Sequence, residues 1–116
     1  MDQDRRKQTR LPANLGTEIE IGGVRADAMT VDASDGGVLV LTRAHPAVGA
    51  KLSLRIMRLD AADPPYAVHG EVVRIEKLEL GNVWSHRLAV RLVELPAGLH
   101  DEIERASERH KELYGS

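Results

Sequence analysis

The sequence contains no cysteine and no phenylalanine, and its only aromatic residues are one tryptophan and two tyrosines, Trp84, Tyr66 and Tyr114. The absence of cysteine excludes disulfides and thiolate chemistry. Because aromatic side chains are so scarce, the core must be built from Leu, Val, Ile and Ala. The same scarcity argues against a single-strand nucleic-acid binder, since such proteins usually present stacking aromatic side chains.

Long apolar runs and a strong charge of one sign are also missing. No stretch approaches the length of a transmembrane helix, and the N-terminus lacks the apolar segment of a signal peptide. We therefore expect a cytoplasmic protein that does not insert into a membrane. A net charge of -2 does not favour a generic polyanion binder. A chain of 116 residues fits one compact domain with one core.

The first ten residues, MDQDRRKQTR, contain no apolar residue after Met1 and concentrate positive charge. A segment of this composition cannot bury enough apolar surface to order itself. We expect residues 1–10 to form a flexible basic arm, followed by a single domain over residues 11–116. Taken alone, such an arm is most simply a solvated basic tail.

Six stretches have the alternation or the composition of β-strands, with turn residues between them. The predicted strands are residues 17–21, 24–31, 38–41, 51–59, 66–75 and 86–95. Apolar residues then recur at helical spacing from Leu99 to Leu113, with acidic residues early and basic residues late, as the helix dipole favours. Regularly spaced antiparallel strands usually close into a small barrel. The expected fold class is therefore mainly β, a six-stranded antiparallel β-barrel with one C-terminal helix over 99–113.

The stretch at residues 32–37, DASDGG, is more particular than a turn requires. Asp32 offers an acceptor-only carboxylate, and Ser34 offers a hydroxyl. Gly36 and Gly37 permit a positive φ and let a ligand approach the main chain closely. Taken alone, this stretch predicts a tight turn between two strands.

Two short motifs occur in a fixed order. Residues 6–10 read Arg-x-x-x-Arg, and residues 32–37 read Asp-x-Ser-x-x-Gly about one β-hairpin later. With Leu11-Pro12 after the first motif, and with six strands and a helix, the sequence resembles the PilZ domain family of bacterial receptors for cyclic di-GMP. The resemblance covers roughly residues 5–95.

The resemblance implies one ligand site assembled from both motifs. The arginines of the arm would bind phosphate and guanine, and the second motif would bind on the face of the barrel. A guanidinium can grip a phosphate, pair with the guanine edge or stack on a base, and a carboxylate suits the N1 and N2 donors of guanine. The implied ligand-binding residues are Arg5, Arg6, Arg10, Asp32, Ser34, Gly36 and Gly37.

Arg5 directly precedes the first motif. In PilZ-like proteins this position is thought to influence whether one ligand or an intercalated pair is bound. Two stacked ligands bring four phosphates together, and their repulsion calls for additional cationic charge. We therefore expect two cyclic di-GMP molecules per protomer.

The sequence departs from the family pattern in its last strand, where Ala89 and Leu92 stand in place of a frequent Gly and Phe. These positions concern packing.

The sequence offers little support for other functions. The five histidines are scattered without metal-ligand spacing, and no phosphate loop of the nucleotide-hydrolase type occurs, so we expect no enzyme, no metal and no cofactor besides the ligand. A PilZ-like adaptor that acts through protein contacts without nucleotide is the main alternative. A small nucleic-acid-binding barrel is a weaker one, given the net acidity. The expected partners are cyclic di-GMP and an unidentified downstream effector protein, with monomer and dimer both open.

If the arm clamps a ligand, ligand should protect it from trypsin. Cleavage after Arg5, Arg6, Lys7 and Arg10 should be fast in the free protein and slow with saturating cyclic di-GMP, because only the phosphates can hold a segment with nothing apolar to bury. Mass spectrometry of a digestion time course measures both rates. Equal rates in the two states would mean that the arm is not the clamp.

Overall fold

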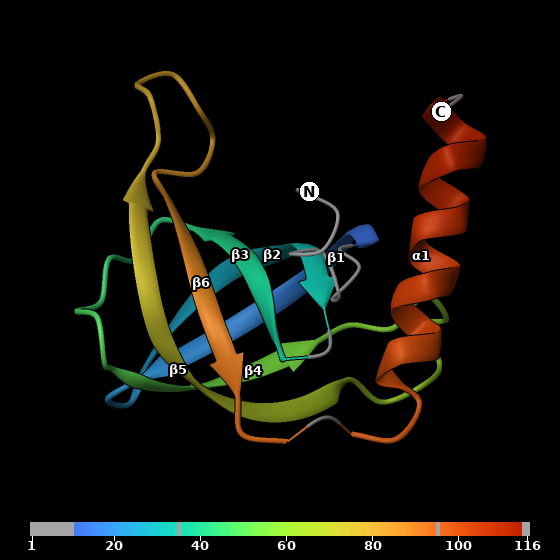
Figure 1. Cartoon of the computed structure of the whole chain (residues 1–116), viewed down its shortest axis with the longest axis horizontal. Helices are drawn as coiled ribbons and strands as arrows, with labels where there is room; N and C mark the ends of the chain where they lie inside the picture. The colour runs from blue at the N-terminus through green and yellow to red at the C-terminus, as the bar shows by residue number, and fades with distance from the viewer. Residues whose placement is uncertain (1–10, 35, 95, 115–116) are drawn as a thin grey trace, which may run out of the picture.

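Six strands and one helix follow one another in the computed structural model, which describes residues 11–34, 36–94 and 96–114 (Figure 1). Their bounds are β1 Leu11–Ile21, β2 Val24–Ser34, β3 Gly37–Thr42, β4 Lys51–Ile56, β5 Tyr66–Lys77, β6 His86–Leu92 and α1 Leu99–Tyr114. All paired strands are antiparallel, and they close into a barrel in the order β1-β2-β3-β6-β5-β4. The predicted fold class is confirmed.

Several strand boundaries differ from the predicted ones. β1 begins at Leu11 rather than Thr17, because its first residues pair with β2 although their sequence does not alternate. β4 ends at Ile56 and β6 at Leu92, each earlier than expected. The burial of β3 alternates although its sequence is continuously apolar from Val38 to Leu41, since every second side chain points out of the barrel.

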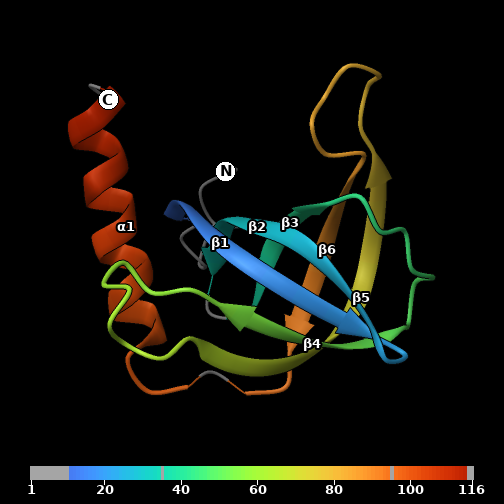
Figure 2. The ribbon, with the colours of Figure 1, turned by 180° about the vertical axis from the view of Figure 1, so that it is seen from behind.

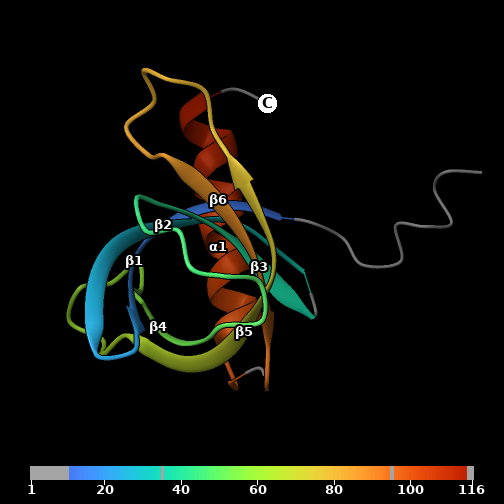
Figure 3. The ribbon, with the colours of Figure 1, turned by 90° about the vertical axis from the view of Figure 1, so that its left-hand side faces the viewer.

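The interior of the barrel is aliphatic, as the composition predicts. Seen end-on, the strands form a closed ring (Figure 3). The least accessible large side chains inside it are Ile19, Val40, Leu54, Ile56, Val72 and Leu88. Two buried threonines also point inward, and their hydroxyls share a hydrogen bond of 2.7 Å between Thr17 and Thr30. Buried hydroxyls that are paired in this way avoid the cost of desolvation without a partner.

Two glycines let neighbouring strands approach β6 closely. A Cβ atom at Gly70 in β5 would lie 2.5 Å from Val90 Cγ1 and 2.8 Å from the carbonyl oxygen of Arg91. A Cβ atom at Gly37 in β3 would collide with the carbonyl oxygen of Val90. Neither glycine has a positive φ. Both positions therefore require glycine because a side chain would not fit, and not because of the backbone conformation.

The helix α1 packs against β1 with its N-terminal half (Figure 2). Leu99, Ile103 and Ala106 are buried and belong to the same core as the barrel. Leu113, which the helical spacing also placed on the apolar face, is 69% exposed, so the end of α1 does not cover the barrel. The helix is too short and too polar to cross a membrane, and no other helix occurs among the described residues.

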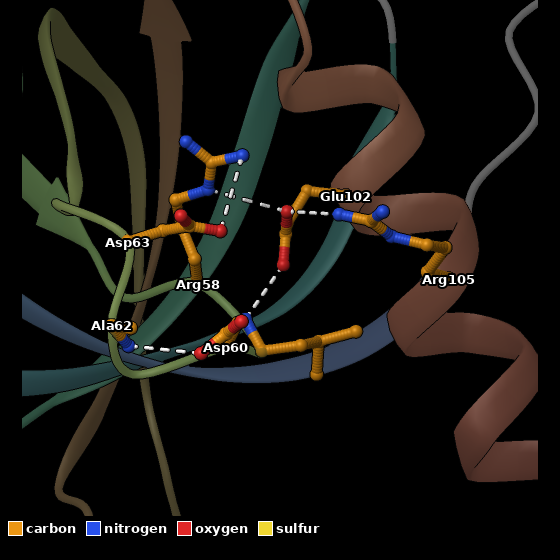
Figure 4. Close-up of polar contacts among 7 residues, drawn as sticks. Arg58, Asp60, Ala62, Asp63, Glu102 and Arg105 are labelled. Atoms are coloured by element: carbon orange, nitrogen blue, oxygen red, sulfur yellow. Dashed lines mark hydrogen bonds and ion pairs between the residues drawn. The ribbon is translucent and has the colours of Figure 1, made fainter.

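A buried carboxylate fastens α1 to the segment that follows β4 (Figure 4). Glu102 is 1% exposed and accepts the backbone N–H of Leu59 at 2.6 Å. It also accepts a hydrogen bond from Arg105 at 2.6 Å and lies 3.4 Å from Arg58 Nε. The guanidinium of Arg58 in turn lies 4.6 Å from the centre of the Tyr66 ring. These contacts compensate for placing a carboxylate in the interior.

Burial alone would raise the pKa of Glu102, but the Leu59 N–H, the hydrogen bond and charge of Arg105 and the charge of Arg58 together hold this pKa below its ordinary value. Because the pKa of Glu102 is lowered, its ionised carboxylate stabilises the folded state fully at pH values above the ordinary pKa of a glutamate, about 4.3. It is lost as the pH falls through that value and then through the lowered pKa of the folded state.

Replacing this carboxylate by an amide should therefore destabilise the protein in a pH-dependent way. Glu102→Gln should lower the free energy of unfolding by about 1–3 kcal/mol at pH 7, because a charged acceptor is lost beside two arginines. The difference from wild type should shrink below about pH 4. Urea unfolding at pH 7 and at acid pH measures it, and the exposed Glu104→Gln provides the control. A constant difference at all pH values would contradict this account.

Candidate ligand-binding site

The second motif lies mostly in strands rather than in a turn. β2 continues to Ser34 and β3 begins at Gly37, and these two residues pair. Asp32 pairs with Leu39. The predicted turn over residues 32–37 is therefore too long, because the strand pairing continues almost to the tip of the hairpin. Asp35 lies outside the described residues. Gly36 is exposed at the tip, where its carbonyl oxygen accepts the N–H of Leu92 at 3.1 Å.

A β-bulge turns Asp32 toward the outside of the barrel. Thr30 pairs with Val40 and Asp32 with Leu39, so Val31 is an extra residue in β2. Thr30 and Ala33 are both buried, and the two residues between them are both half-buried. In strict alternation from Thr30, Asp32 would point into the apolar core. The bulge shifts the alternation by one residue and keeps the carboxylate on the outer face.

The start of β1 lies beside this carboxylate. Pro12 pairs with Asp32, and Leu11 pairs with Ala33. β1 carries its own irregularity at this level, where Asn14 has a φ of 63°, a conformation that asparagine adopts more readily than most residues. Arg5, Arg6 and Arg10 lie outside the described residues, but a single peptide bond joins Arg10 to Leu11. The strand pairing therefore places the two residues that follow the first motif beside the second motif.

The outer face next to Asp32 continues as a row of residues across four strands. Leu39 in β3 follows Asp32, then come Ala89 in β6 and Arg74 in β5. Leu39 and Ala89 each stand between buried neighbours, so their side chains point outward. A leucine and an alanine side by side form a low, apolar surface with a carboxylate at one end and a cation at the other.

Arg74 ends this row, Arg87 and Arg91 flank Ala89 on β6, and sequence reasoning missed all three arginines. Arg91 pairs with Glu71 at 2.8 Å, and Arg87 pairs with Glu76 at 2.7 Å. Arg74 is exposed and forms no ion pair within the described part of the chain. They were missed because only the strand order, in which β6 lies between β3 and β5, places them near the second motif.

The sequence model of the PilZ domain matches residues 4–109. The chain belongs to the PilZ domain family. The match extends beyond the barrel into α1, further than the motifs alone indicated. A comparison with curated proteins finds no significant match.

Solved structures share the fold of this PilZ domain at low sequence identity. The PilZ domain of YcgR from Escherichia coli, solved with c-di-GMP, is 16% identical, with a TM-score of 0.73 over 97% of this chain and 98% of that one. The Bacillus subtilis inhibitor of motility, MotI/DgrA, is 20% identical, with a TM-score of 0.66 over 95% of this chain. This PilZ domain spans about half of MotI, 53% of its length.

The structure gives Gly37 a role that does not depend on a ligand. Gly37→Ala should lower the free energy of unfolding by about 1–3 kcal/mol, because the new methyl group meets the backbone of β6. Urea unfolding without ligand measures this effect. Leu39→Ala, a change on the outer face of the same strand, should cost clearly less. A Gly37→Ala protein as stable as wild type would contradict the close approach.

Proposed function

We propose that this PilZ domain binds cyclic di-GMP on the outer face of β2, β3 and β6 and relays the signal to an effector protein. The observation that supports this most directly is the pairing of Pro12 with Asp32. It places the attachment point of the arginine-rich arm beside the outward carboxylate of the second motif. A ligand with guanines and phosphates needs both groups at one place.

The chemistry of the face suits the two parts of such a ligand. Asp32 accepts hydrogen bonds from the N1 and N2 donors of guanine. The low apolar surface of Leu39 and Ala89 takes the plane of a base, and the arginines of the arm grip the phosphates. Arg74, at the far end of the row, is a further cation for a phosphate or a base plane.

Removing the carboxylate should weaken nucleotide binding specifically. Asp32→Ala should raise the Kd for cyclic di-GMP at least tenfold, because losing one partner of a desolvated charged contact costs roughly 2–5 kcal/mol. Arg10→Ala should have an effect of the same order. Asp27→Ala is the matched control, since it removes a carboxylate from the outer face of the same strand. Isothermal titration calorimetry measures all four proteins.

Two outcomes of this titration would contradict the proposal. If wild-type protein gives no heat and no thermal shift at saturating ligand, it does not bind cyclic di-GMP. The alternative function, an adaptor that acts by protein contacts alone, would then be favoured. Equal losses of affinity in Asp32→Ala and Asp27→Ala would show that the two changes act through general electrostatics rather than through a site at Asp32.

The same calorimetric titration measures how many ligand molecules each protomer binds. Wild type should bind two cyclic di-GMP molecules per protomer, and Arg5→Leu should lower this ratio toward one while retaining affinity, because the stacked pair needs the additional cation. Arg25→Leu, an exposed arginine at the far end of the β1–β2 hairpin, should leave the ratio unchanged. A wild-type ratio near one, unchanged in Arg5→Leu, would make Arg5 an ordinary surface charge.

A further inference from the structure

Two arginines on the outer face of β6, which lies between β3 and β5 (Figure 1), are each paired with a glutamate directly opposite on β5. Arg87 donates two hydrogen bonds to Glu76, from Nε at 3.0 Å and from Nη2 at 2.7 Å. Arg91 donates one to Glu71, from Nη2 at 2.8 Å, and its side chain is 65% exposed. In the described part of the chain, the other guanidinium nitrogens of Arg91 form no hydrogen bond.

The two arginines also differ in what lies beside them on β3. Arg91 pairs with Gly37, and Gly37 pairs in turn with Ser34 of the second motif. Arg91 therefore lies only two strands from Ser34, roughly 10 Å away, and the residue between them has no side chain. Arg87 pairs with Leu41, whose side chain points outward and fills the corresponding place with an apolar group. Only Arg91 has an open path toward the motif.

The basic arm is attached at the same end of the face as Arg91. Leu11, the first described residue after the arm, pairs with Ala33 near the tip of the β2–β3 hairpin. On the other side of that hairpin, the N–H of Leu92, next to Arg91, donates to the carbonyl oxygen of Gly36 at 3.1 Å. In the strand order, β2 and β3 lie between β1 and β6. An anion at the hairpin tip therefore lies between the attachment point of the arm and Arg91.

Glu71 has a second cation beside it. Lys51 on β4 pairs in register with Glu71 on the side opposite Arg91. Lys51 is exposed and forms no ion pair among residues 11–34, 36–94 and 96–114. Loss of Arg91 therefore leaves the carboxylate with a neighbouring cation. An exposed ion pair contributes little to stability, whereas a guanidinium can bind a phosphate through two charge-assisted hydrogen bonds.

We propose that a phosphate of cyclic di-GMP takes Arg91 from Glu71, and that Glu71 then pairs with Lys51. This inference rests on the proposed function. It adds Arg91 to the ligand-binding residues and makes Glu71 the residue that restrains it in the free protein. The exchange also moves a charged contact from β6 to β4. Ligand binding thereby changes the contacts of a strand that lies outside the site.

A double-mutant cycle, measured by isothermal titration calorimetry with cyclic di-GMP, tests the exchange. Arg91→Gln should raise the Kd about tenfold, because a charged contact to a phosphate is lost. Glu71→Gln should lower the Kd about threefold, because Arg91 no longer has to leave an ion pair. The double variant should have the Kd of Arg91→Gln alone, since Glu71 acts on the ligand only through Arg91.

The second ion pair on the same two strands provides matched controls. Arg87→Gln and Glu76→Gln remove the same charges from β6 and β5. Each should leave the Kd within about twofold of wild type, because salt screens exposed charges that do not contact the ligand. Equal effects at the two pairs would show that general electrostatics is responsible, and would overturn the proposal.

The titrations separate this proposal from the proposed function. If wild type binds and Asp32→Ala weakens binding, wild-type affinity in Arg91→Gln would overturn the exchange and leave the proposed function standing. So would a Glu71→Gln change that still tightens binding when Arg91 is absent. If wild type does not bind cyclic di-GMP, the proposed function fails and the exchange fails with it.

The last step, in which Glu71 pairs with Lys51, has its own readout. In a nuclear magnetic resonance titration with cyclic di-GMP, the side-chain methylene signals of Lys51 should move in wild type and stay unchanged in Glu71→Gln. Signals that move equally in both proteins, or in neither, would overturn this step.

Discussion

One extra residue in β2 determines which way the second motif faces. A closed barrel has no free edge, so an additional residue cannot be absorbed by sliding a strand and must appear as a bulge. Val31 takes that position. Before it, Ala28 and Thr30 point inward, and after it Ala33 does. Without the bulge, Asp32 would be an ionised group inside an aliphatic core, at a cost that no nearby cation of the core could offset.

β1 contacts both the second motif and α1. Its first residues pair with β2 beside Asp32, and it also provides the packing surface for α1. The irregularities at Asn14 and Val31 lie opposite each other, one in each strand of the β1–β2 hairpin.

Much of the fold could be predicted because its determinants are local. Alternation identified the strands, helical spacing identified α1, and the missing aromatics identified an aliphatic core. The helix pattern was a poorer guide to burial. Glu102 has the sequence position of an ordinary acidic residue in a first helical turn, yet it is buried. Its burial could not be predicted, because its partners Leu59 and Arg58 lie far away in the sequence and only Arg105 lies on the same helix.

The site could be predicted only in part for the same reason. The motif identified Asp32, but no sequence feature around Val31 predicts a β-bulge. Gly37 was interpreted as a turn residue that permits a positive φ, and its closeness to Val90 depends on β3 pairing with β6, a strand distant in sequence. Ala89 joins the face through the same pairing, and Arg74 joins it through the pairing of β5 with β6. Local patterns can name candidate residues, but the order of strands decides which of them meet.

The most direct test of the central claim is a nuclear magnetic resonance titration of the isotopically labelled chain with cyclic di-GMP. If the ligand binds the outer face beside the bulge, the amide signals of Asp32, Leu39 and Ala89 should move most, together with those of the first residues of β1. The amide signals of Glu20 and Arg25, at the far end of the β1–β2 hairpin, should stay unchanged. The largest changes at that far end, or no change at saturating ligand, would contradict the account.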